Sequence, residues 1–117
     1  MSTIFQKVFL PKKKLMELEQ KQEIMKIVST ATVMHTAYIN KHNIVVRRFS
    51  IKDNGYNIYS ERTFDGSRAP GQEIQYTLHI HNGKRIEYAT HSTIDKFAHR
   101  VYNRMYASWN KSKGNAR

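Results

Sequence analysis

The chain has 117 residues, with 20 lysines and arginines against 9 aspartates and glutamates, so its formal net charge is +11 at pH 7. It contains no cysteine, which excludes a disulfide framework, thiol catalysis and a cysteine-based zinc site. No apolar run approaches the ~18–20 residues that a membrane-spanning helix needs. The length predicts a single domain over 1–117, and 39% hydrophobic residues can fill its small core.

The first third of the chain predicts an arm followed by a long helix. Residues 1–11 are expected to form an N-terminal arm or a short strand. They lack the charged start and long apolar stretch of a secretion signal, which favours a cytoplasmic location. After Pro11, apolar residues recur at helical spacing and predict a helix over about 12–28. Residues 29–36 are rich in β-branched side chains and could continue the helix or form a strand; we expect the helix to continue.

A first β-hairpin is predicted within residues 44–64. Two runs with strand character flank Asn54-Gly55, and Asn-Gly between such runs is a strong hairpin signal. A two-residue turn would place Arg47 opposite Arg62. This like-charge pair is unfavourable unless an anion or solvent separates the two side chains.

A second hairpin is predicted over 74–90, after a turn-rich loop at 65–71. In its first strand, apolar residues alternate with polar ones, which predicts one buried face and one exposed face. A strict two-residue turn at 82–83 would bring Ile86 beside His79, on the polar face. We therefore expect a bulge or a longer turn in this hairpin.

The last element is predicted to be an amphipathic helix. Ser92 is the expected N-cap, with Asp95 three residues later in the capping-box position. An apolar stripe should dock on the sheet, while the opposite, basic side faces solvent. The stripe comprises Ile94, Phe97, Ala98, Val101, Met105 and Trp109. Residues 111–117 are expected to form a loose basic tail.

Together these elements predict an α+β fold: a four-stranded antiparallel sheet made of two hairpins, with a long N-terminal helix and a C-terminal helix packed on one face. Residues 72–113 have the layout of a strand, an Asn-Gly turn, a second strand and a capped basic helix. The residues that carry it are Tyr76-Thr77-Leu78-His79-Ile80-His81-Asn82-Gly83-Lys84, followed by Ala89-Thr90-His91. This layout resembles the end of a double-stranded-RNA-binding domain and also that of ribosome-hibernation factors. The resemblance implies RNA as a partner and transfers no binding residues, because Ser92–Lys96 lacks the paired lysines of the former family.

The cations lie in stretches without acids, since residues 24–52 and 96–117 contain no aspartate or glutamate. This concentration of positive charge favours the binding of a polyanion. We therefore expect a small nucleic-acid-binding protein, with RNA or a ribonucleoprotein favoured, that holds phosphates through a basic helix face and the sheet edge. The predicted phosphate contacts are Lys12, Lys13, Lys14, Arg47, Arg48, Arg62, Arg68, Lys84, Arg85, Lys96, Arg100, Arg104, Lys111 and Lys113.

Tyrosines and histidines supply further candidates. The tyrosines that could stack on unpaired bases, or else be half-buried in the fold, are Tyr56, Tyr59, Tyr102 and Tyr106. His79 and His81 project from one strand face and could serve acid–base cleavage of RNA or ligate a metal. No carboxylate lies at ligand spacing, so we expect neither a metal site nor a cofactor.

Two alternatives to non-enzymatic nucleic-acid binding remain open. One is a small phage-type interaction protein, or inhibitor, that docks on an acidic host protein. The other is a metal-independent RNase that uses the strand histidines.

Overall fold

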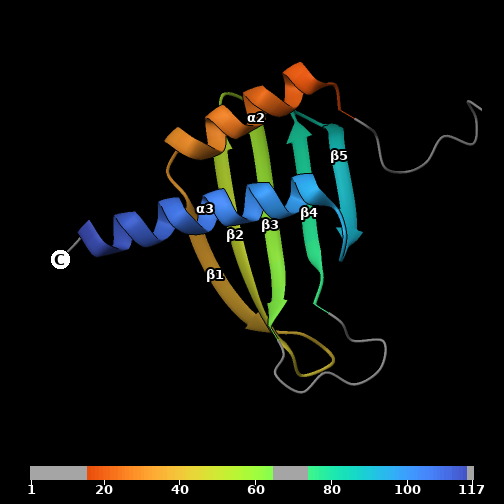
Figure 1. The fold of residues 1–117 in the computed structure, drawn as a ribbon, viewed down its shortest axis with the longest axis vertical. Coiled ribbons are helices and arrows are strands. Elements are labelled where there is room, and N and C mark those ends of the chain that lie inside the picture. Colours follow the sequence, from red (N-terminus) through yellow and green to blue (C-terminus); the bar gives the residue numbers. More distant parts are fainter. Residues whose placement is uncertain (1–15, 65–73, 116–117) are drawn as a thin grey trace, which may run out of the picture.

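The computed structural model describes residues 16–64 and 74–115. They form a five-stranded antiparallel sheet, in the order β1-β2-β3-β4-β5, and two helices. The elements in chain order are α2 (Leu18–Thr30), β1 (Met34–Ile39), β2 (Val45–Asp53), β3 (Tyr56–Phe64), β4 (Tyr76–Asn82), β5 (Arg85–Ser92) and α3 (Lys96–Asn115). Both helices lie over the same face of the sheet (Figure 1). The α+β class is confirmed, and the sheet has one strand more than predicted.

The additional strand, β1, forms where the sequence predicted more helix. The hydroxyls of Ser29 and Thr30 donate to the carbonyls of Met25 and Lys26. Such bonds from a side chain to the carbonyl four residues earlier slightly destabilise a helix. The chain then leaves the helix, and residues 34–39 pair with β2. The prediction of a continuous helix is wrong. The β-branched and aromatic residues of this segment favour a strand, and the edge of β2 supplies the backbone partners that the strand needs.

The hairpin of β2 and β3 has the predicted turn and register. Asn54 and Gly55 have φ angles of 54° and 84°, the left-handed conformation that a type I′ turn requires at both positions. Arg47 lies opposite Arg62, as predicted.

The hairpin of β4 and β5 contains the expected irregularity. Ile80 pairs with Tyr88, and the next pair joins His81 to Ile86. Glu87 is therefore the extra residue of a bulge. The bulge places Tyr88 on the face that the helices cover, whereas Ile86 pairs with His81 on the other face and is 50% exposed.

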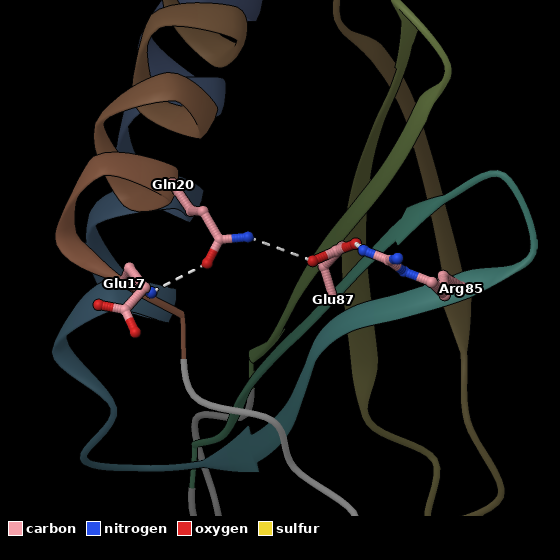
Figure 2. A network of polar contacts seen from close by, with 4 residues as sticks. All are labelled: Glu17, Gln20, Arg85 and Glu87. Atoms are coloured by element: carbon pink, nitrogen blue, oxygen red, sulfur yellow. Dashed lines mark hydrogen bonds and ion pairs between the residues drawn. The ribbon is translucent and has the colours of Figure 1, made fainter.

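Glu87 connects this bulge to the start of α2. Its carboxylate, only 2% exposed, accepts hydrogen bonds from Arg85 Nη2 at 2.8 Å and from Gln20 Nε2 at 3.4 Å. The Oε1 atom of Gln20 in turn accepts the backbone N–H of Glu17 at 3.0 Å (Figure 2). The buried charge is thus satisfied, and the contacts fix the beginning of the described helix against β5.

The core fills the space between the sheet and the two helices. Alternate residues of β4 are buried, as the sequence pattern predicted. The best-buried apolar residues come from both helices and the three central strands: Ile24, Val28, Phe49, Ile51, Ile58, Leu78, Ile80, Val101, Tyr102 and Met105. This core leaves the other face of the sheet without a described helix (Figure 1).

Asp95, rather than Ser92, caps α3. One Asp95 oxygen accepts the backbone N–H groups of Phe97 and Ala98, each at 3.0 Å, which is the N-cap arrangement. Ser92 is instead the last residue of β5, and its hydroxyl accepts the N–H of Ile94. The predicted capping box was wrong because the strand continues two residues further than expected, to Ser92.

Two other expectations for this region are corrected. Ile94 is 83% exposed and does not belong to the apolar stripe, because it precedes the helix. The predicted loose tail is helical as far as Asn115. The predicted arm, residues 12–15 of the first helix, and the loop at 65–71 lie outside the described residues.

Candidate functional site

The exposed side of α3 carries a row of cations that we call the α3 basic face: Lys96, Arg100, Arg104 and Lys111, all of them exposed. The helix contains no aspartate or glutamate. Among the described residues, the ion pairs are Arg48 with Glu61 and Arg85 with Glu87. The four cations of the face are therefore not neutralised by a described carboxylate, and they remain available to an anion.

A groove lies beside this face. It has a volume of about 440 Å³ and runs between the end of α2, the residues that follow it, and the second half of α3. Arg104 and Lys111 line it together with five hydroxyl side chains, and none of its lining residues is acidic. Arg104 Nε donates to the Ser29 hydroxyl at 3.0 Å. Cations and hydroxyl donors without acids are the groups that hold phosphate oxygens.

Two predicted phosphate contacts, Arg47 and Arg62, point toward the helix layer instead. The Arg47 guanidinium lies 5.0 Å from the ring centre of Tyr106, and that of Arg62 lies 5.6 Å from Tyr76. Both arginines are half-buried. The aromatic rings accommodate the like-charge pair, and these arginines contribute to packing rather than to an exposed cationic surface.

The other predicted phosphate contacts are dispersed. Arg48 is engaged with Glu61 on the helix-free face, and Arg85 with Glu87. Lys84 is exposed at the β4–β5 turn, and Lys113 lies 4.7 Å from the ring centre of Trp109. The residues of the predicted set that lie outside the described part of the chain are Lys12, Lys13, Lys14 and Arg68.

The candidate stacking tyrosines differ in exposure. Tyr102 is 2% exposed, so its ring presents no face to a base, and this part of the prediction is corrected. Burial raises the pKa of its hydroxyl, while Arg47 and Arg62 act to lower it. Tyr106 is 38% exposed, and Tyr56 and Tyr59 are half-buried.

Three histidines gather on the helix-free face. The ring centres of His79 and His81 are 6.3 Å apart, and those of His79 and His91 are 5.7 Å apart. Burial, with the neighbouring His91 and His81, lowers the pKa of His79. His91 was missed by sequence reasoning, because its place beside β4 depends on the position of the bulge. No group of three metal-ligating side chains in the described ranges is suited to hold a metal ion.

A second cluster missed from the sequence surrounds Trp109. His35 of β1 stacks on the indole with ring centres 4.3 Å apart, and Arg47 lies 5.5 Å from the same ring. Burial, with Arg47 and Lys113, lowers the pKa of His35. Because β1 was expected to be helical, no sequence signal placed His35 near the last helix.

Comparison with known proteins yields no significant match, whether to a family model, to a curated sequence or to a solved structure. Neither helix in the described part of the chain is long and apolar enough to cross a membrane. We therefore infer the function from the surfaces of this chain.

Proposed function

We propose that this protein binds nucleic acid through the α3 basic face and the adjoining groove, and that RNA or a ribonucleoprotein is the partner. The observation that carries the proposal is the set of exposed, unneutralised cations on a helix without acids. Lysine and arginine side chains in such a row neutralise phosphates and release bound counterions, which supplies most of the sequence-independent affinity for a polyanion.

The groove extends this surface with groups that position a phosphate. Arg104 and Lys111 provide charge, while the hydroxyls of Ser108 and Ser112 lie among the neutral groups beside them. Contacts of this kind orient a nucleic-acid backbone without reading its sequence. The protein is therefore proposed to bind with weak sequence preference and with no chemical step of its own.

The test is the affinity of the native protein and of the double variant R100E/R104E for a fluorescently labelled RNA, measured by fluorescence anisotropy. We expect the variant to bind at least about tenfold more weakly, since two phosphate contacts become repulsive. Both side chains are exposed, so circular dichroism should show an unchanged fold.

A charge-matched control is the double variant K26E/K41E, which changes two exposed lysines on α2 and in the β1–β2 turn. Its net charge equals that of R100E/R104E, and it should retain most of the RNA affinity. Equal affinity of R100E/R104E and the control would show that the α3 basic face is not the site. A partner captured equally well after nuclease treatment would favour the docking of an acidic protein instead.

The RNase alternative gains one specific observation, the proximity of the His79, His81 and His91 rings. Two imidazoles near one phosphate could act as general base and general acid. Electrophoresis of the RNA recovered from the binding experiment tests this alternative. RNA that is cut by the native protein but intact after incubation with H79Q would support cleavage. RNA that is intact with both proteins would exclude it.

A further inference from the structure

The helix-free face of the sheet carries a surface that the proposed function does not use. Figure 1 shows both helices on the opposite face. Cross-strand pairing aligns two rows of side chains here: Arg48, Glu61, Thr77 and His91 form one, and Ser50, Tyr59, His79 and Ala89 the other. These side chains are half-exposed or exposed, so a ligand can approach them from solvent.

Flat rings from three strands lie together on this surface. The Tyr59 ring centre is 6.4 Å from that of His81, and His81 lies 6.3 Å from His79. His91 adds a fourth ring at 5.7 Å from His79. We call these four side chains the ring cluster. Tyr59, His79 and His81 are half-exposed and His91 is exposed, so part of each ring reaches solvent.

The cationic side chain of Arg48 borders the ring cluster. The Arg48 guanidinium lies 4.6 Å from the ring centre of Tyr59. Glu61, the acid that the described strands place on this face, is already engaged by Arg48 at 3.6 Å and by the Tyr38 hydroxyl at 3.1 Å. Arg48 and Glu61 balance one another, so this part of the surface offers aromatic rings with little net charge, which suits the stacking of unpaired bases.

A hollow adjoins Tyr59 on the same face. Its volume is about 500 Å³, and its lining includes Met34, Thr36, Ser50 and Lys52. That volume falls within the ~300–1,000 Å³ typical of small-ligand sites. Met34 is 63% exposed, so an apolar contact is available beside the Tyr59 ring. A planar group could thus be held between a ring and an aliphatic side chain.

We propose that this face binds single-stranded RNA by stacking unpaired bases on Tyr59, His79 and His81, an inference that rests on the proposed function. A duplex conceals its base faces within the helical stack, whereas a single strand can splay them onto aromatic side chains. Lys52, which lines the adjoining hollow, contacts a phosphate between the stacked bases. The α3 basic face lies on the other side of the sheet, so the two surfaces can be tested separately.

The experiment uses a short RNA containing 2-aminopurine, either alone or annealed to its complement. Stacking on a protein ring changes the fluorescence of this base analogue, and anisotropy gives the affinity. We expect the variant Y59T/H81T to bind the single strand at least about tenfold more weakly and to lose the fluorescence change. Its affinity for the duplex should stay within about twofold of native, because the duplex is held through phosphates on α3.

The control variant is I86T. Ile86 is 50% exposed and pairs with His81 across the strands, but it has no ring. Its retention of single-strand affinity would support stacking, and a loss equal to that of Y59T/H81T would overturn it. Thr is compatible with strands, and circular dichroism reports whether each variant folds.

A measurement on the native protein avoids any folding defect. In amide-proton and nitrogen NMR spectra, single-stranded RNA should shift the signals of Tyr59, His79, His81 and His91, which the duplex leaves in place. If both RNAs shift α3 signals alone, this proposal is overturned and the proposed function stands. If neither RNA binds or shifts any signal, both proposals fail.

Discussion

At the scale of single residues, surroundings decide which cations can meet a ligand. Arg47 and Arg104 carry the same charge, yet Arg47 is half-buried beside Tyr106 while Arg104 is exposed beside a groove. An arginine packed on a ring contributes through its contact area as well as its charge. The charge of the chain therefore overstates the number of cations on any one binding surface.

His79 yields a prediction about pH. Burial and the neighbouring His91 and His81 lower its pKa below the ordinary value of 6.5, Arg48 acts in the same direction, and Glu61 acts to raise it. The unfolded chain therefore binds more protons than the folded protein just below pH 6.5. The stability associated with this histidine is present above that pH and is lost as the pH falls toward the folded-state pKa.

The measurement is urea denaturation of the native protein and of H79Q at pH 7.5 and pH 5.5. We expect the free energy of unfolding to fall between these pH values, and to fall less in H79Q. His35, whose pKa is also lowered, should account for part of the remaining loss. An equal loss in H79Q and the native protein would contradict the assignment to His79.

At the scale of elements, the start of α3 depends on Asp95. Burial acts to raise the pKa of this carboxyl, but hydrogen bonds from the Tyr88 hydroxyl, from Thr90 and from the backbone N–H groups of Ala98 and Phe97 lower it overall. The folded protein thus favours the ionised form, and the associated stability is lost as the pH falls below about 4. Asp95 thus caps the start of α3 and also joins the helix to β5 through the Tyr88 hydroxyl.

The substitution D95A should lower the free energy of unfolding by about 2 kcal/mol, the upper part of the range for a lost N-cap, because Tyr88 also loses its partner. S92A should change it by less than about 0.5 kcal/mol, since the Ser92 hydroxyl accepts an exposed N–H outside the helix. Chemical denaturation measures both. A larger loss in S92A would restore Ser92 as the cap.

Local chemistry explains which elements could be predicted from the sequence. Asn54-Gly55 determines both the turn and the pairing of its strands, because few residues tolerate the left-handed conformation at two successive positions. The sequence of β1 is compatible with either a helix or a strand. Its strand conformation depends on pairing with β2, which lies outside the segment itself. The bulge at Glu87 could be anticipated from the pattern, whereas its position depends on burial against α2.

The candidate site was predictable in the same partial way. The charge of α3 follows from its residues, and its helical period separates the basic face from the buried side. Alternation in β2 also places Arg47 on the same face as Phe49, so the sequence already indicates that Arg47 lies on the buried face of the sheet. The ring cluster needed the register of three strands, including the bulge, before His91 could be placed beside His79.

At the scale of the whole molecule, the two-layer arrangement gives the protein two different surfaces. Both helices cover one face of the sheet (Figure 1). The helix layer presents the α3 basic face, and the helix-free face presents the ring cluster. The first suits phosphates in any nucleic acid, and the second suits unpaired bases. A protein with both surfaces should favour RNA in which single-stranded and paired segments adjoin.

The central claim is that exposed cations on α3 bind phosphates, and the salt dependence of RNA affinity tests it most directly. For the native protein, the logarithm of the association constant should fall steeply and linearly with the logarithm of salt concentration. For R100E/R104E the slope should be shallower by about 1.5–2, because two phosphate contacts are absent. A slope that is near zero in the native protein, or identical in the two proteins, would contradict the account.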